Sequence, residues 1–277
     1  MSTKFTRGSL SASFGRPFVT LILIATLVFL ALPVFATFIS SFAAEWSGVI
    51  PTGFVTLSNW HDVIVGTGIG AQRSVGSSLF YSAGLALGGV VINLIVGVPI
   101  AYAVSRYDFW GRDMVNLFAI LPLAPGIILG IAFLRTYPEL STTGIALVIG
   151  YSLLKAPYMV MAVQSSFQSM DLRQIEESAR SLGASWPRTF LTIIVPNART
   201  GIIAGSIISW TLAAAEFNFS YIVFSRGTPP LSLFLFKNIT NASFLNAAAA
   251  VSVFFLLIAV VTISLQIVGH RGTIKRV

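Results

Sequence analysis

Two ionisable residues, Lys155 and Glu216, lie inside stretches of this sequence that are otherwise apolar. A charged side chain in such a stretch is costly to hold away from water, so it usually has a functional partner. Glu216 could form an ion pair with Lys155, act as a structural or gating residue, contact a cationic solute, or lie at an interface. Lys155 directly precedes Ala156-Pro157, and we expect its ammonium group to be paired or to extend toward water.

Other residue types that carry chemistry are sparse. Asn93 and Tyr158 are candidates for lining a solute path, or for satisfying backbone groups of neighbouring helices. The chain has no cysteine, and its histidines, His61 and His270, are far apart, so a metal site is not expected. No GxxxxGK[ST] phosphate-binding loop is present, so ATP hydrolysis is expected on another polypeptide.

Composition excludes a soluble globular domain. Hydrophobic residues make up 55% of the chain and charged residues only 9%, with a mean hydropathy of +0.86. Soluble domains carry about 25% charged residues. The net charge of +8 could suggest a nucleic-acid partner. The basic residues are instead distributed as in membrane proteins, so we predict an all-α polytopic membrane protein and no nucleic-acid binding.

The apolar stretches set the expected elements. A helix needs roughly 20 apolar residues to cross the hydrocarbon core, and about six stretches qualify. They cover residues 18–42, 78–104, 114–134, 143–163, 200–222 and 244–268. We expect one membrane domain over residues 1–277, with a long external segment at 43–77 and a long cytoplasmic segment at 164–199.

Orientation follows from the basic residues, because membrane proteins concentrate Lys and Arg on the cytoplasmic side. Placing both termini in the cytoplasm leaves only Arg73, Arg135, Arg226 and Lys237 outside or at that interface. The first stretch follows basic residues and is longer than a signal-peptide core, so we expect it to be retained as a helix. The protein is therefore expected in a bacterial-type cytoplasmic (inner) membrane, as a multi-pass protein with both termini inside.

The third stretch contains Pro122, Pro125, Gly126 and Gly130. Two prolines and two glycines within one span indicate a kinked or discontinuous helix, and hence a hinge. The pair Gly126 and Gly130 is also a small-xxx-small pattern, which is typical of close helix packing. The two interpretations are compatible.

The cytoplasmic segment predicts two short helices joined by a turn. Asp171 is placed to cap the first helix, and Gly183 can stop it in the left-handed region. Ser185 can cap the second helix, with Pro187 in its first turn, and Pro196 is expected to end it. The first helix is expected to place Leu172, Ile175, Ala179 and Leu182 on an apolar side, and Arg173, Glu176 and Arg180 on a polar side. From periodicity alone, such a hairpin could simply pack beneath the bundle.

The same segment resembles the EAA signature of permease subunits of binding-protein-dependent type I ABC importers. That pattern is Glu-Ala-Ala, three residues, Gly, nine residues, Ile, one residue, Leu-Pro. The residues that fall on its positions are Glu177, Ser178, Ala179, Gly183, Ile193 and Pro196, with Ser178 replacing an Ala and Val195 replacing the Leu.

The resemblance implies a non-catalytic membrane subunit whose EAA-like residues couple it to an ATPase. The implied partners are two ATP-binding subunits that hold ATP and Mg²⁺, a second permease subunit, an extracytoplasmic solute-binding protein and the lipid bilayer. The stretch Leu121 to Gly130 and the region of Glu216-Phe217 look closest to the polyamine, phosphonate and ferric-ion branch. A sugar or glycerophosphate importer, an ion-gradient-driven transporter and a non-transporting scaffold are the alternatives.

Overall fold

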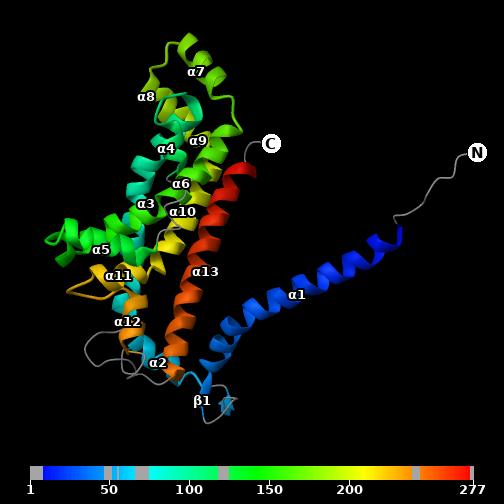
Figure 1. Ribbon diagram of the computed structural model, residues 1–277, viewed down its shortest axis with the longest axis vertical. Coiled ribbons are helices and arrows are strands. Elements are labelled where there is room, and N and C mark those ends of the chain that lie inside the picture. Colours follow the sequence, from blue (N-terminus) through cyan, green and yellow to red (C-terminus); the bar gives the residue numbers. More distant parts are fainter. Residues whose placement is uncertain are drawn as a thin grey trace, which may run out of the picture.

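The computed structural model describes residues 9–46, 52–54, 56–65, 75–117, 125–238 and 244–274, and these ranges are dominated by helices (Figure 1). The predicted all-α fold is confirmed, with one small antiparallel ribbon added to it. In chain order the elements are α1 (Ser9–Ser40), β1 (Ala43–Glu45), β2 (Thr52–Phe54), α2 (Ser58–Val65), α3 (Val75–Arg106), α4 (Arg112–Leu117), α5 (Gly126–Thr136), the 3₁₀ turn η2 (Leu140–Thr142), α6 (Gly144–Gln168), α7 (Leu172–Ser181), α8 (Trp186–Thr189), the π-helix η3 (Phe190–Ile194), α9 (Val195–Asn197), α10 (Arg199–Ala214), α11 (Asn218–Val223), α12 (Leu231–Asn238) and α13 (Phe244–Ile274).

Four helices in the described ranges are long and apolar enough to cross a membrane, or up to five if one bent pair counts as a single span. The four are α1, α3, α6 and α13, and they coincide with the predicted spans 18–42, 78–104, 143–163 and 244–268. The predicted span 114–134 corresponds to α4 and α5, with residues 118–124 between them outside the described residues.

The prediction of one continuous helix over 200–222 was wrong. Helix α10 ends at Ala214 and α11 begins at Asn218, so the helix is interrupted at residues 215–217. The carboxylate of Glu216 accepts a hydrogen bond from the backbone N–H of Phe219 at 3.2 Å, which satisfies a donor at the start of α11. The hydroxyls of Ser220 and Ser232 donate to the Glu216 carbonyl at 3.1 and 3.0 Å. A helix can break at this depth because these side chains replace the lost backbone bonds.

The centre of the molecule is formed by α3, α6 and α10, which pack against one another along their lengths (Figure 1). Small residues allow this close approach: a Cβ at Gly89 would lie 3.4 Å from the Cβ of Tyr151, and one at Gly205 would lie 2.9 Å from the sulfur of Met159. The ring of Phe219 from α11 is fully buried beside this centre. Close packing, rather than exclusion of water, holds helices together in lipid.

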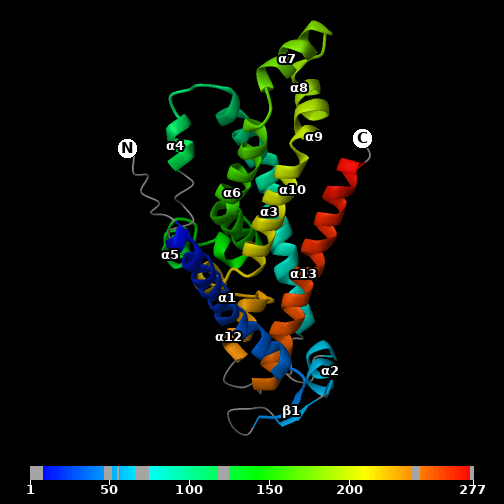
Figure 2. The same ribbon diagram turned by 90° about the vertical axis from the view of Figure 1, so that its right-hand side faces the viewer.

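Helix α1 extends away from the rest of the molecule in Figure 1, and in Figure 2, turned by 90°, it runs in front of the other helices. Most of its membrane-length part, Pro17–Ser40, is exposed, whereas Ser40 at its end is buried and the helix contacts α13. The β1–β2 ribbon and α2 follow, and the amide of Asn59 ties them to α1 by donating to the carbonyls of Ser41 and Ala43 at 3.2 and 2.8 Å. Neither the ribbon nor α2 was predicted for the segment 43–77.

Different secondary-structure elements lie at the two ends of the molecule. Helices α7 and α8 and the end of α13 lie at the top in Figure 1, whereas β1 and α2 lie at the bottom. Helices α7 and α8 and the β1–β2 ribbon with α2 therefore lie at opposite ends, as expected for segments on opposite sides of a membrane.

Candidate functional site

The first arm of the candidate site is α7, in a hairpin that comprises residues 169–198. The side chain of Asp171 caps α7 by accepting a hydrogen bond from the N–H of Gln174 at 3.0 Å, as predicted. Gly183 has φ of +77°, the left-handed conformation predicted for the turn. The N–H of Ala184 donates to the carbonyl of Ala179 at 3.0 Å and that of Gly183 to Arg180 at 2.9 Å, which closes the end of the helix.

The second arm differs from the prediction in two respects. Ser185 occupies the capping position of α8, but its side chain makes no cap hydrogen bond. Pro196 does not end the helical run: it lies in α9, and α10 follows after a bend of 72° next to Ala198. Because Pro196 has no N–H to donate back, the turn before it widens into the π-helix η3, and the amide of Asn197 donates to the Ile193 carbonyl at 2.8 Å.

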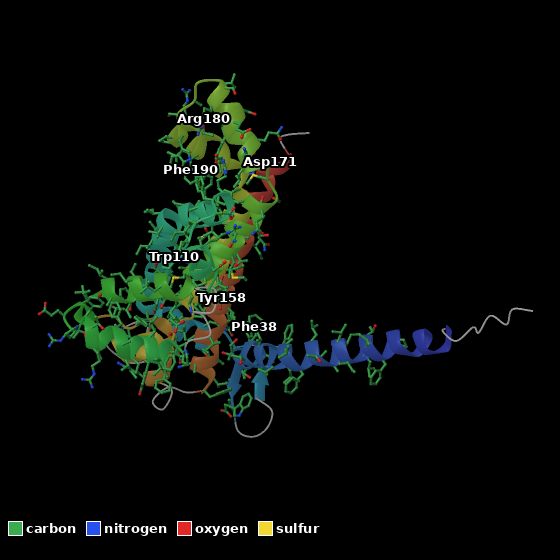
Figure 3. All side chains as sticks on the ribbon, turned by 45° about the horizontal axis from the view of Figure 1, so that its top comes forward. Phe38, Trp110, Tyr158, Asp171, Arg180 and Phe190 are labelled. Atoms are coloured by element: carbon green, nitrogen blue, oxygen red, sulfur yellow. The ribbon has the colours of Figure 1, made fainter. Side chains whose placement is uncertain are left out.

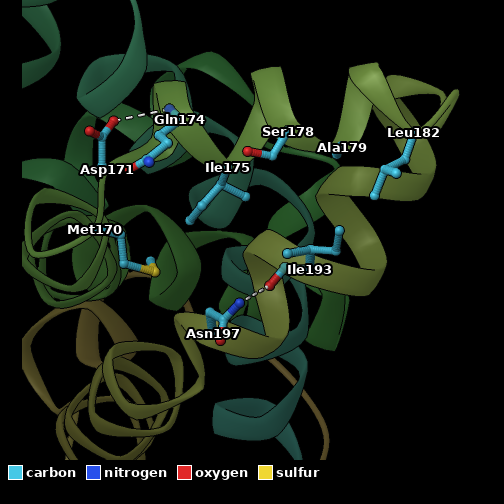
Figure 4. Close-up of a pocket in the computed structure, with 9 residues that line it drawn as sticks. All are labelled: Met170, Asp171, Gln174, Ile175, Ser178, Ala179, Leu182, Ile193 and Asn197. Atoms are coloured by element: carbon cyan, nitrogen blue, oxygen red, sulfur yellow. Dashed lines mark hydrogen bonds between the residues drawn. The ribbon is translucent and has the colours of Figure 1, made fainter.

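A pocket of about 680 Å³ opens between the two arms (Figure 4). Three of the predicted coupling residues line it, namely Ser178, Ala179 and Ile193, whereas Glu177, Gly183 and Pro196 do not. The remaining lining residues are Met170, Asp171, Gln174, Ile175, Leu182 and Asn197. The pocket therefore has an apolar floor with amide, hydroxyl and carboxylate groups around it, a surface suited to another protein.

Glu177 and Arg173 of α7 point outward, and so does Leu182, which directly follows the helix. The carboxylate of Glu177 accepts a hydrogen bond from Arg173 at 2.9 Å, and both side chains are largely exposed, at 65% and 76%. Leu182 was expected on the buried side, but it is 89% exposed because α7 has already ended where it stands. The hairpin thus presents an acid, a base and an apolar side chain to its surroundings.

The prediction for Glu176 was also wrong, since this residue is 8% exposed rather than on the solvent side. Its two carboxylate oxygens accept hydrogen bonds from the hydroxyl of Tyr102 and, at 2.9 Å, from Nε of Arg106, both at the end of α3. Sequence reasoning missed this residue because its partners are 74 and 70 positions away. The only local signal was a second acid next to Glu177.

The broken span holds the second group of candidate residues. Nζ of Lys155 lies 2.5 Å from a carboxylate oxygen of Glu216, and the two side chains are 13% and 10% exposed. The ion pair that the sequence left open is therefore present, and it joins α6 to the break between α10 and α11. The hydroxyl of Ser209 donates to the Lys155 carbonyl at 3.3 Å, and α6 continues through Pro157 without interruption.

Gly126 and Gly130 both face α11, as the small-xxx-small interpretation predicts. A Cβ at Gly126 would lie 3.0 Å from the Glu216 carboxylate, and one at Gly130 would lie 3.0 Å from Ile222. Pro125 precedes the first residue of α5, so it starts that helix instead of kinking it. Pro122 lies outside the described residues, and the hinge at this stretch stays a prediction.

Asn93 and Tyr158 are not part of the ion pair. Oδ1 of Asn93 accepts a hydrogen bond from the hydroxyl of Ser152 at 2.7 Å, and the residue is 2% exposed between α3 and α6. Tyr158, labelled in Figure 3, is half-buried on α6. Asn93 therefore joins α3 to α6 through a side-chain hydrogen bond, and its two predicted roles, lining a solute path or satisfying backbone groups, stay predictions. In the part of the chain that the structure describes, no cluster of three or more His, Cys, Asp or Glu could hold a metal ion.

Comparison with known proteins places these features in context. Residues 89–272 match a family described as "Binding-protein-dependent transport system inner membrane component". The chain is 30% identical over 146 residues to a molybdate/tungstate transport system permease protein, WtpB, of Pyrococcus furiosus; the match covers 52% of this chain and 57% of that protein. It is 25% identical over 261 residues to the spermidine/putrescine transport system permease protein PotC of Escherichia coli, covering 91% and 96%. The chain thus spans little more than half of the first relative and nearly all of the second.

Solved structures resemble the fold. A chain of a bacterial ABC transporter involved in the import of the acidic polysaccharide alginate gives a TM-score of 0.65 at 17% identity, covering 98% of this chain and 99% of that chain. The MetNI methionine ABC transporter, in an inward-facing conformation, gives a TM-score of 0.54 at 17% identity, covering 71% and 93%. At these identities the likeness concerns the fold.

Proposed function

Because the chain belongs to the family of binding-protein-dependent transport system inner membrane components, we propose that it is the permease subunit of an ATP-driven importer. In this proposal it moves a small solute across a bacterial-type cytoplasmic membrane by alternating access. ATP and Mg²⁺ bind to two copies of a partner ATPase, and a second permease subunit completes the path. A solute-binding protein on the outer side delivers the solute.

The observation that carries the proposal is the hairpin of residues 169–198. It lies at one end of the molecule and combines an exposed tip with a pocket lined by Ser178, Ala179 and Ile193. Glu177 stands exposed beside them, and Gly183 supplies the turn. A rigid element of this kind can pass the closure of an ATPase dimer to the helices that it joins, provided that ATP binding favours one membrane conformation.

The hairpin also supports a proposed orientation. Its end of the molecule would face the cytoplasm, together with both termini, and the β1–β2 ribbon and α2 would face the outer side. This arrangement follows the bias of basic residues, since Arg173, Arg180, Arg188 and Arg199 all belong to the hairpin or follow it directly.

For the solute we favour a small oxyanion over a polyamine. Glu216, the acid in the broken span, is already paired with Lys155 at 2.5 Å, so it is not a free counter-ion for a cation. Molybdate/tungstate and sulfate permeases are among the relatives. The second candidate is a polyamine, which the match to PotC over 91% of this chain favours.

The same ion pair weakens a gradient-driven mechanism. A transporter driven by protons needs an ionisable group that gains and loses its charge along the path. Lys155 on α6 and Glu216 at the break between α10 and α11 are instead bonded to each other and are only 13% and 10% exposed. An ATPase partner is therefore the more economical source of energy.

The test begins with affinity purification of the tagged chain in mild detergent and mass spectrometry of its partners. We expect a phosphate-loop ATPase, a second multi-span protein and a solute-binding protein. The binding protein is then titrated with molybdate, sulfate and spermidine, and the complex is assayed in liposomes for ATP-dependent uptake of whichever binds. A chain that purifies alone and transports without ATP would overturn the proposal.

A further inference from the structure

Two short non-helical connections join the hairpin covalently to the membrane helices. One is the non-helical segment 169–171 after α6, and the other is the turn at Ala198, where the chain bends by 72° into α10. A hairpin held by these connections alone could pivot against the bundle when a partner pushes it. The two connections would then bend when the tip moves, and the movement would not reach the membrane helices.

A third connection, not covalent, ties the hairpin to α3. The carboxylate of Glu176 on α7 accepts hydrogen bonds from the Tyr102 hydroxyl and from Nε of Arg106, the latter at 2.9 Å. Glu176 is 8% and Arg106 25% exposed, and both carboxylate oxygens are occupied. We call Tyr102, Arg106 and Glu176 the latch.

The surroundings of Tyr102 extend the latch to the second arm of the hairpin. Nε1 of Trp186 on α8 donates to the Tyr102 hydroxyl at 3.2 Å. The Tyr102 ring lies 5.1 Å from that of Phe190 in the hairpin and 5.9 Å from that of Phe167 on α6. In Figure 3, Phe190 lies toward the helix bundle and Arg180 toward the tip of the hairpin. One buried tyrosine thus contacts both arms of the hairpin and the end of α6.

We propose that the latch makes α3 move as one body with the hairpin, so that Glu176 is a positioning residue for coupling. The proposal rests on the importer function proposed above. A buried carboxylate that loses its partners stays uncompensated in a low-dielectric site, so separation of α3 from the hairpin is strongly opposed. A movement of the hairpin caused by the ATPase therefore displaces α3 as well as α6 and α10.

Comparison of Glu176 with the adjacent Glu177 distinguishes transmission of movement to α3 from docking of the ATPase. Glu177 is 65% exposed and faces outward, where a partner could reach it, whereas Glu176 is enclosed by its own chain. Loss of Glu177 should weaken docking of the ATPase. Loss of Glu176 should leave docking and ATP hydrolysis intact but reduce the solute moved for each ATP.

The test measures solute transported per ATP hydrolysed by the reconstituted complex. Glu176→Gln keeps the size of the side chain but removes its charge, and we expect this ratio to fall about tenfold, within the range of usual coupling free energies. Tyr102→Phe, which keeps the ring contacts, should lower the ratio less. Asp108→Asn is the matched control, because it removes an acid paired with Arg112 on the surface, 92% exposed, near the same helix end.

A second measurement follows the distance between α3 and the hairpin, which general destabilisation of the protein would not change in the same way. Because the chain has no cysteine, spin labels can be placed on Cys introduced at Asp108, after α3, and at Arg180 on α7. We expect the label distance to stay unchanged on ATP binding in the wild-type background and to change in Glu176→Gln. If that variant does not assemble, Tyr102→Phe carries both measurements, with the same expectations.

The outcomes distinguish the two proposals. An unchanged transport ratio and an unchanged label distance in the latch variants would overturn the latch while leaving the importer function in place. A wild-type complex that lacks an ATPase, or that shows no ATP-driven uptake, would overturn the proposed function and the latch with it.

Discussion

The hairpin and the broken span each contain a glutamate bonded to a basic residue, yet the two pairs have different consequences. Glu177 and Arg173 are 65% and 76% exposed, whereas Glu216 and Lys155 are 10% and 13% exposed. An exposed pair contributes about 0–1 kcal/mol, while removal of one partner from a buried pair costs about 3–5 kcal/mol. The same chemistry therefore fixes the broken span and leaves the tip of the hairpin free to meet a partner.

The largest effect is expected from Lys155→Met. This change leaves the Glu216 carboxylate buried without its cation, so we expect the free energy of unfolding in detergent to fall by about 3–5 kcal/mol. The double variant Lys155→Met/Glu216→Gln should recover most of the loss, because the neutral amide can still accept the bond from Phe219. Equal stability of the single variant and the wild type would show that the pair does not fix the span.

The next effect concerns packing in the same region. A Cβ at Gly150 would lie 2.1 Å from the ring of Phe219, which is fully buried. Gly150→Ala should therefore cost about 1–3 kcal/mol, measured by thermal unfolding in detergent. Gly84→Ala is the matched control, since a Cβ there meets no atom within 4 Å. A melting temperature lowered equally by both changes would contradict this account.

At Gly183 in the hairpin, we expect the backbone conformation rather than a lack of space to limit substitution. A Cβ at Gly183 has open space around it, but its φ of +77° is unfavourable for a β-branched residue. Gly183→Val should cost about 1–2 kcal/mol locally, with little change in the melting temperature of the bundle. The turn would be distorted, and we expect less ATPase to co-purify. Gly183→Asn, which tolerates the left-handed region, should retain the ATPase; if both variants retain it, the turn has no role in docking.

The smallest effect on stability is expected from Glu177→Gln. It breaks only an exposed pair, so the free energy of unfolding should change by less than about 0.5 kcal/mol. Recovery of the ATPase on purification should nevertheless fall, because the partner would lose a charged contact. A stability loss comparable with that of Lys155→Met would remove the contrast between the two regions.

Local signals in the sequence were sufficient for much of the hairpin. Asp171 caps α7 and Gly183 turns the chain because each acts on backbone groups within a few residues. Hydropathy likewise predicted α1, α3, α6 and α13 to within a few residues, except that α13 and the N-terminal end of α1 extend further. Such features depend on sequence neighbours, and so they can be derived from them.

The features that the sequence did not predict depend on contacts between residues far apart in the chain. The periodicity of α7 placed Glu176 on a polar face, and only Tyr102 and Arg106, on a helix distant in sequence, explain its burial. The break at Glu216 was hidden because its flanks are apolar and helix-forming, so a continuous span was the simplest prediction. Periodicity records which residues are apolar, not which polar residues find partners inside the fold.

The ion pair of the broken span also bears on how the protein is made. Lys155 precedes Glu216 by 61 residues, so at a synthesis rate of about 5–20 residues per second its partner emerges roughly 3–12 s later. An unpaired lysine at the centre of a span disfavours insertion by about 2.5–3.5 kcal/mol on translocon scales. We therefore expect α6 to be held less firmly in the membrane until the chain beyond α10 has been synthesised, and a ribosome that stops between the two residues to leave a span that is less well retained.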